Sequence, residues 1–214
     1  MASSPVRIVI VDTNCFLRLY QSPVLPFLGQ EVGGFRLLTL ECLVAEFLES
    51  PTLIKNYPCV ASGPKNIDLK NAQLKPRSAT KASIQNAEKE LRPYAKSLLE
   101  LYCKNRNITP AKNLSRCDIE LLATVISVRG MLATDEWPLR TVAYDLLEDP
   151  NEYNIGVLSS LDLLHLLEVN GKLTPEDRRT TVDSWVRYKE NLLKGWQADY
   201  QRLFGESAEL LGKD

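Results

Sequence analysis

The chain is poor in the residues that several kinds of active site need. It has one histidine, His165, and its five cysteines are scattered without a C-x-x-C pair, so we do not expect a zinc site. An odd number of dispersed cysteines is typical of reduced thiols in a cytoplasmic protein. They are Cys15, Cys42, Cys59, Cys103 and Cys117.

Several sequence signatures are also missing. No apolar run approaches the roughly 20 residues of a membrane span, and no basic segment precedes an apolar one at the start, so we expect neither a membrane anchor nor a signal peptide. No Walker A, G-x-G-x-x-G or G-x-S-x-G pattern is present. A catalytic triad through His165 is therefore not favoured, and a partly buried helical histidine is expected instead. The net charge of −1 is not that of a protein that holds duplex DNA by charge alone.

The first apolar run is the clearest element of the sequence. Residues Val6 to Val11 are almost all apolar and mostly β-branched, without alternation, which is typical of a strand buried on both faces of a parallel sheet. Asp12, Thr13 and Asn14 follow directly. Ligand sites of open α/β sheets lie at the carboxyl ends of the strands, so Asp12 has a position that favours a functional role.

Strands and helices are expected to alternate along the chain, which predicts an α/β fold with a mainly parallel sheet. Expected strands cover residues 35–40, 131–134 and 154–158 in addition to the first. Expected helices cover residues 14–20, 41–48, 84–105, 115–129 and 161–168, with Pro93 ending or kinking the third of them. The connection from Gln21 to Gly34 is expected to be loop, with an apolar turn at Val24 to Leu28.

Residues 61–82 differ from the rest in composition. They contain few large apolar side chains, and five basic residues stand against Asp68. We expect a long mobile loop here, either simply solvated or in contact with nucleic acid. The basic residues are Lys65, Lys70, Lys75, Arg77 and Lys81.

The end of the chain has aromatic residues at helical spacing. The pattern predicts one long helix from Pro175 to about Phe204, whose aromatic face either packs on the domain or forms a partner or homodimer surface. The aromatic positions are Trp185, Tyr188, Trp196, Tyr200 and Phe204.

Four acidic residues occupy comparable positions in this pattern. Asp12 and Asp135 each follow a strand, Glu46 lies in the helix after the second strand, and Asp118 lies in the first turn of the strongest helix. If the strands are parallel, these carboxylates meet at one edge of the sheet. Clustered carboxylates repel one another unless cations bind, and Mg²⁺ or Mn²⁺ suits an all-oxygen site. Such ions support phosphodiester hydrolysis without a protein nucleophile.

Each acid also has a simpler explanation. Asp12 could cap the following helix, and Asp118 fits a capping-box pattern with Ser115. Glu46 could be a solvated helix residue, and Asp135, with Glu136 beside it, could be surface charge. The order of the acids along the chain is more informative than any one of them.

Segments around these acids resemble the PIN-domain ribonucleases, a family that includes the toxins of bacterial and archaeal toxin–antitoxin pairs. The resemblance spans about Val6 to Leu167, most of the chain. It rests on Ile8–Asn14, Leu43–Leu48, Asp118–Ala123, Leu132–Asp135 and Val157–Asp162.

The resemblance implies a PIN-like α/β/α sandwich and a metal-dependent endoribonuclease acting on RNA. Asp12, Glu46, Asp118 and Asp135 would ligate Mg²⁺ or Mn²⁺, and Asn14 and Thr134 would orient ligands or water. An antitoxin protein is the implied partner. The nuclease domain would cover residues 1–171, with a loop and helix insertion at about 51–113, followed by a helical extension over 172–214. The insertion and the extension both depart from compact members of the family.

Two other functions are compatible with the sequence. The fold could serve as a non-catalytic module that binds RNA or protein. A phosphohydrolase with Asp12 as nucleophile ranks last, because Asp12-Thr13-Asn14 lacks the second aspartate that the haloacid-dehalogenase-like pattern requires.

Overall fold

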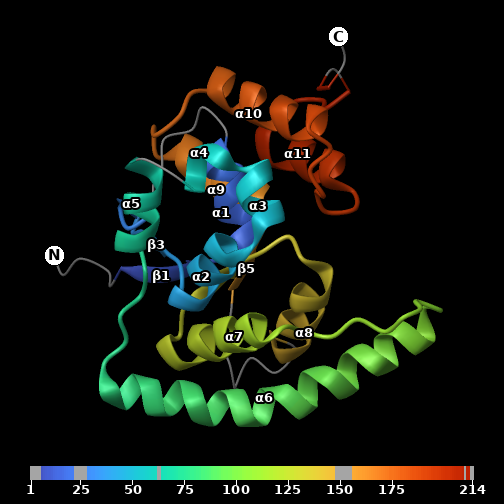
Figure 1. Ribbon diagram of the computed structural model, residues 1–214. Coiled ribbons are helices and arrows are strands. Elements are labelled where there is room, and N and C mark those ends of the chain that lie inside the picture. Colours follow the sequence, from blue (N-terminus) through green and yellow to red (C-terminus); the bar gives the residue numbers. More distant parts are fainter. Residues whose placement is uncertain (1–5, 22–27, 62–63, 148–155, 210, 213–214) are drawn as a thin grey trace, which may run out of the picture.

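A computed structural model describes residues 6–21, 28–61, 64–147, 156–209 and 211–212. Its centre is a five-stranded sheet in the order β2-β3-β1-β4-β5 (Figure 1). The strands are β1 (Arg7–Val11), β2 (Glu31–Val32), β3 (Phe35–Leu38), β4 (Met131–Ala133) and β5 (Gly156–Leu158). All neighbouring pairs are parallel except β2 with β3. The predicted α/β class with a mainly parallel sheet is confirmed.

The central strand β1 has the burial that its composition predicts. It pairs with β3 on one side and with β4 on the other, and Val9, Ile10 and Val11 are fully buried. A strand covered on both faces can be apolar at every position, because neither face meets water. The carboxyl ends of β1, β3, β4 and β5 therefore share one edge of the sheet.

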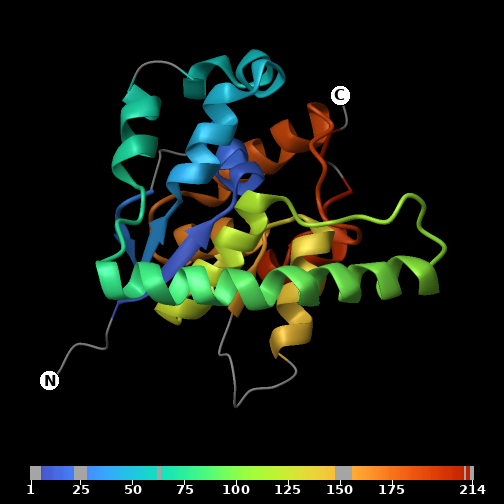
Figure 2. The same ribbon diagram turned by 60° about the horizontal axis from the view of Figure 1, so that its bottom comes forward.

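Helices cover both faces of the sheet. On one face lie α7 (Arg116–Val128) and α8 (Trp137–Leu147), with the long α6 (Ser78–Asn105) packed along both of them (Figures 1 and 2). On the other face lie α1 (Thr13–Gln21) and α9 (Ser160–Val169), with α10 (Pro175–Arg187) and α11 (Trp196–Phe204) beyond α9 (Figure 1). The short helices α2 (Glu41–Glu49), α3 (Pro51–Asn56), α4 (Pro58–Ala61) and α5 (Pro64–Asn71) follow β3.

The prediction of a loop over residues 61–82 is wrong for most of that stretch. Helix α5 covers residues 64–71, Gln73 forms a β-bridge with Thr39, and α6 already begins at Ser78. Leu69 and Ala72 are buried against the core, and these few apolar contacts are what fix a mostly polar segment. Composition alone hides such contacts because two well-placed apolar side chains suffice to dock a short helix.

Of the two effects expected of Pro93, an end of the helix is wrong, because α6 continues through Pro93 to Asn105. Pro93 lies on the exposed side of α6. The carbonyl of Lys89, which loses its helical partner to the proline ring, belongs to an exposed residue and can bind water instead.

The prediction of a single helix from Pro175 to about Phe204 is wrong as well. Helices α10 and α11 are separate, and the chain between them adopts positive φ at Lys189 (55°) and Gly195 (84°). Trp185 and Tyr200 are buried in the common core, whereas Tyr188 is 70% exposed. The interpretation that this aromatic face packs on the domain is confirmed for Trp185 and Tyr200.

Two further expectations concern particular segments. Of the turn expected at Val24 to Leu28, only Leu28 lies within the described residues. Of the strand expected over residues 154–158, residues 154 and 155 lie outside the described residues. His165 is half-buried in α9 and makes an edge-to-face contact with Phe204, with ring centroids 5.6 Å apart. Within the described part of the chain, no helix is long and apolar enough to cross a membrane.

Candidate functional site

Asp12 lies where β1 ends, and its carboxylate is buried. One oxygen accepts a hydrogen bond from the backbone N–H of Thr13 at 2.6 Å, and the other accepts from the Thr134 hydroxyl at 2.8 Å. Thr134 follows β4, which is paired with β1, so the parallel register itself brings the two side chains together. The Thr134 hydroxyl in turn accepts a hydrogen bond from the N–H of Glu136 at 3.1 Å.

The charges of Glu136 and Asp118 act on Asp12, and the charge of the exposed Glu46 acts on Glu136. Burial, followed by the negative charges of Glu136 and Asp118, raises the pKa of Asp12 to about 8. Burial also raises the pKa of Glu136, and Asp118 and Glu46 raise it further. These four carboxylates, which we name the acidic cluster, come from the residue after β1, from α2, from α7 and from the residue before α8. They are Asp12, Glu46, Asp118 and Glu136.

The acidic cluster is not neutralised by the protein's own cations. Within the described residues, none of its four carboxylates forms a salt bridge. Arg18 lowers the pKa of Glu136 only through its charge, and Asn14 does so by a hydrogen bond from its side-chain amide to Glu136. Oxygen donors with uncompensated negative charge are the chemistry of a Mg²⁺ or Mn²⁺ site.

Asp135, the fourth ligand expected from the sequence, has different partners. Its carboxylate forms a buried salt bridge with Arg18 and accepts hydrogen bonds from both the N–H and the hydroxyl of Ser160, at 3.1 and 2.5 Å. The charge of Asp135 is thus paired with that of Arg18, which makes Asp135 a weaker candidate to ligate a cation than the unpaired Asp12. Its neighbour Glu136 lies beside Asp12 instead.

The missed residue with the clearest sequence signal is Arg18. Asn14 and Arg18 are four residues apart in α1, so they lie on the same helical face, which points to the carboxyl edge of the sheet. Arg18 also donates to the backbone oxygen of Asn191 at 2.8 Å and lies 3.4 Å from Glu190. It thereby joins the strand-end acids to the segment between α10 and α11.

Asp118 has the local role that its spacing predicts, in addition to its place in the acidic cluster. Ser115 and Asp118 form a complete capping box, in which the Asp118 carboxylate accepts from the N–H of Ser115 at 2.7 Å. Only one carboxylate oxygen is used in this bond. The cap therefore fixes the side chain, and the charge of Asp118 still acts on Asp12 and Glu136.

A groove with a volume of about 880 Å³ opens beside Asn14 and Glu136. Its walls come from the end of α6, the start of α8 and the segment between α10 and α11. They include Tyr102, Arg106, Lys112, Trp137 and Lys194. Basic and aromatic side chains thus adjoin the acidic cluster.

Of the five basic residues expected to contact RNA, the four whose side chains the structure describes do not line this groove. Lys75 and Lys81 line a different cavity of about 660 Å³ together with Arg116, between α6 and α7. Lys70 and Arg77 are exposed, and the side chain of Lys65 lies outside the described residues.

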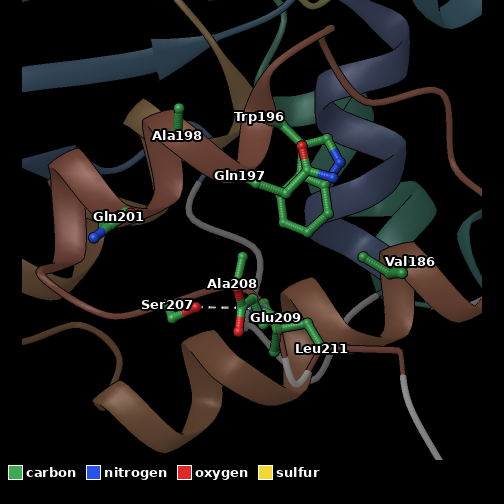
Figure 3. Close-up of a pocket in the computed structure, with 9 residues that line it drawn as sticks. All are labelled: Val186, Trp196, Gln197, Ala198, Gln201, Ser207, Ala208, Glu209 and Leu211. Carbon is green, nitrogen blue, oxygen red and sulfur yellow. Dashed lines mark hydrogen bonds between the residues drawn. The ribbon is translucent and has the colours of Figure 1, made fainter.

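Another pocket, of about 780 Å³, belongs to the C-terminal region (Figure 3). It is lined by Val186 of α10, by residues of α11 that include Trp196 and Gln197, and by Ser207, Ala208, Glu209 and Leu211. It contains none of the four acids of the cluster, and we assign it no role.

As the side chains are placed, no three acidic, histidine or cysteine residues of the described chain are arranged to hold a metal ion. The four carboxylates interact through their charges without converging on one point. Comparison with protein-family models, with curated proteins and with solved structures finds no match for this chain.

Proposed function

We propose that the protein is a metal-dependent endoribonuclease with a PIN-like fold. The observation that carries the proposal is the acidic cluster at the carboxyl edge of a parallel sheet, centred on the buried Asp12 and uncompensated by the basic side chains around it. The sequence resemblance to PIN-domain ribonucleases supports the same chemistry. A toxin role and an antitoxin partner remain predictions from that resemblance.

The residues of the cluster have distinct roles in this proposal. Asp12 and Glu136 would hold Mg²⁺ or Mn²⁺, with Asp118 and Glu46 completing the site in place of the paired Asp135. Thr134 and Asn14 fix the orientations of the Asp12 and Glu136 carboxylates through the hydrogen bonds described above. The bound ion would supply an activated water and neutralise charge on the phosphodiester.

The proposal predicts RNA cleavage that requires Mg²⁺ or Mn²⁺ and that EDTA stops. Asp12→Asn should lower the rate at least about 100-fold, because removing one charged ligand weakens ion binding and transition-state stabilisation. Glu49→Gln, an exposed substitution at the end of α2, is the matched control and should keep full activity. Full activity of Asp12→Asn at matched purity would refute the assignment.

A second candidate is a non-catalytic RNA-binding module. The absence of three converging ligands among the described residues favours it. In that case RNA would bind without turnover, and Mn²⁺ would leave the melting temperature unchanged. A nuclease that binds the ion only when folded should instead melt at a higher temperature with Mn²⁺.

A further inference from the structure

We propose that Trp137, Tyr102 and Arg106 form a stacking subsite that seats one nucleobase of single-stranded RNA beside the acidic cluster. This inference rests on the proposed function, because it identifies how the substrate of the same site is held. The subsite uses α6, which lies in the stretch where the chain departs from compact PIN domains, so the resemblance does not supply it.

Trp137 and Arg106 both lie against the Tyr102 ring. The rings of Tyr102, near the end of α6, and Trp137, the first residue of α8, have centroids 5.4 Å apart and planes 26° apart. The guanidinium carbon of Arg106 lies 4.5 Å from the Tyr102 ring centroid. Planar aromatic and guanidinium groups of this kind are the surfaces on which single-stranded nucleic acid bases stack.

The stack and one acid of the cluster, Glu136, share one groove. Trp137 follows Glu136 directly in the sequence, and the groove of about 880 Å³ is lined by Asn14, Glu136 and all three members of the stack. A base on the stack therefore leaves its own phosphate within the groove that Glu136 lines. The stack is thus placed to set which phosphodiester lies at the acidic cluster.

The groove also has positive charge for the RNA backbone. Arg106, Lys112 and Lys194 line it and are exposed, and none of them forms a salt bridge within the described residues. They come from the end of α6, the connection to α7 and the segment before α11. Cations without a salt-bridge partner suit a strand that carries one negative charge per nucleotide.

The chain contains a matched pair outside the groove. On α8, the Arg140 guanidinium carbon lies 5.2 Å from the Tyr144 ring centroid, and Tyr144 is 46% exposed. Tyr144→Leu removes an arginine-stacked tyrosine from the same region without touching the proposed subsite. Lys89→Gln, at an exposed position of α6, is the corresponding control for Arg106→Gln.

The test is binding of a fluorescein-labelled single-stranded RNA octamer, measured by anisotropy in EDTA so that no cleavage occurs. A single abasic nucleotide is moved along the octamer. For the unaltered protein, one position should weaken binding by roughly 5- to 100-fold, the range for loss of one base–aromatic stack. Tyr102→Leu should lose the same affinity and become insensitive to the abasic position, whereas Tyr144→Leu should behave like the unaltered protein.

Since Tyr102 is half-buried, Arg106→Gln provides a second, exposed variant that should lower affinity more than Lys89→Gln does. No RNA binding, no abasic dependence, or equal losses in Tyr102→Leu and Tyr144→Leu would overturn the subsite. RNA binding with the expected pattern but no cleavage in Mn²⁺ would overturn the nuclease and keep the subsite. RNA cleavage in Mn²⁺, together with unchanged RNA binding by Tyr102→Leu and Arg106→Gln, would overturn the subsite and keep the nuclease.

Discussion

At the scale of single residues, Asp12 combines burial with two hydrogen bonds that do not compensate its charge. A raised pKa means that the folded protein holds the Asp12 proton more tightly than the unfolded chain does. In the absence of a cation, the contribution of Asp12 to folding therefore becomes less favourable as pH rises from about 4 to about 8. Below about pH 4 the group is protonated in both states and has no effect.

This sign predicts that Asp12→Asn stabilises the metal-free protein at pH 8 by roughly 2–4 kcal/mol and changes it little at pH 4. The amide oxygen can still accept from Thr13, and its N–H₂ can donate to the Thr134 hydroxyl. Urea unfolding in EDTA at several pH values measures the difference. An equal free-energy change at both ends of this range would contradict the burial of a charged carboxylate.

Substitution in the Arg18–Asp135 pair should destabilise the protein, because here a buried carboxylate has a buried cation as its partner. Arg18→Met should lower the free energy of unfolding by about 3–5 kcal/mol, since Asp135 is left uncompensated. Arg202→Met, which breaks the exposed Arg202–Asp199 pair, should cost less than about 1 kcal/mol. If the double variant Arg18→Met/Asp135→Leu recovers no stability, the buried charge is not the cause.

The residue scale also shows how far the sequence predicts the site. Parallel strands ending in Asp12 and Asp135 made a common edge predictable, and Asp12 and Thr134 do meet there. Which of Asp135 and Glu136 faces the cluster depends on Arg18 and Ser160, which approach from other elements. Neighbouring acids are equivalent in a sequence pattern until those partners are known.

At the scale of elements, capping boxes set where three of the helices begin. Asp118 of α7, Asp162 of α9 and Asp177 of α10 are each the third residue of the helix and pair with a Ser or Thr cap three residues earlier. These starts are local in sequence, which makes them predictable. Helix α5 and the break between α10 and α11 depend on contacts with distant residues, so local pattern failed there.

The capping boxes allow the two roles of Asp118 to be separated. Asp118→Asn and Asp177→Asn each keep an oxygen for the N–H of the cap residue, so each should cost less than about 1 kcal/mol. Only Asp118→Asn should lose RNA cleavage, because only Asp118 lies in the acidic cluster. Thermal unfolding and cleavage rates measured together test this, and equal activity of both variants would leave Asp118 as a helix cap alone.

At the scale of the whole molecule, residues after α9 are part of the main core. The buried Arg178 of α10 joins Glu168 of α9 to Tyr200 of α11 and to Glu206. Trp185 packs in the same core and donates from its ring N–H to the backbone oxygen of Arg18 at 3.2 Å. The C-terminal helices thus reach the element that follows Asp12.

Substitutions of Trp185 in α10 and of Tyr188 at its C-terminal cap test whether the C-terminal helices belong to the main core. Trp185→Ala should lower the free energy of unfolding by about 3–5 kcal/mol, because Trp185 is 2% exposed and its removal leaves a large cavity. Tyr188→Ala, at a site 70% exposed, should change it by less than about 0.5 kcal/mol. Chemical denaturation followed by circular dichroism measures both, and similar losses would show that the aromatic stripe is not divided as described.

The strand order has a consequence for the synthesis of the chain. The central strand β1 is made before its neighbour β4, and the Thr134 hydroxyl that binds Asp12 comes 122 positions after Asp12. The apolar edge of β1 that pairs with β4 must wait until β4 has left the ribosome, and such long-range pairing folds slowly. The acidic cluster consequently assembles only after β4 has emerged, so the nascent chain cannot act through this site before that point.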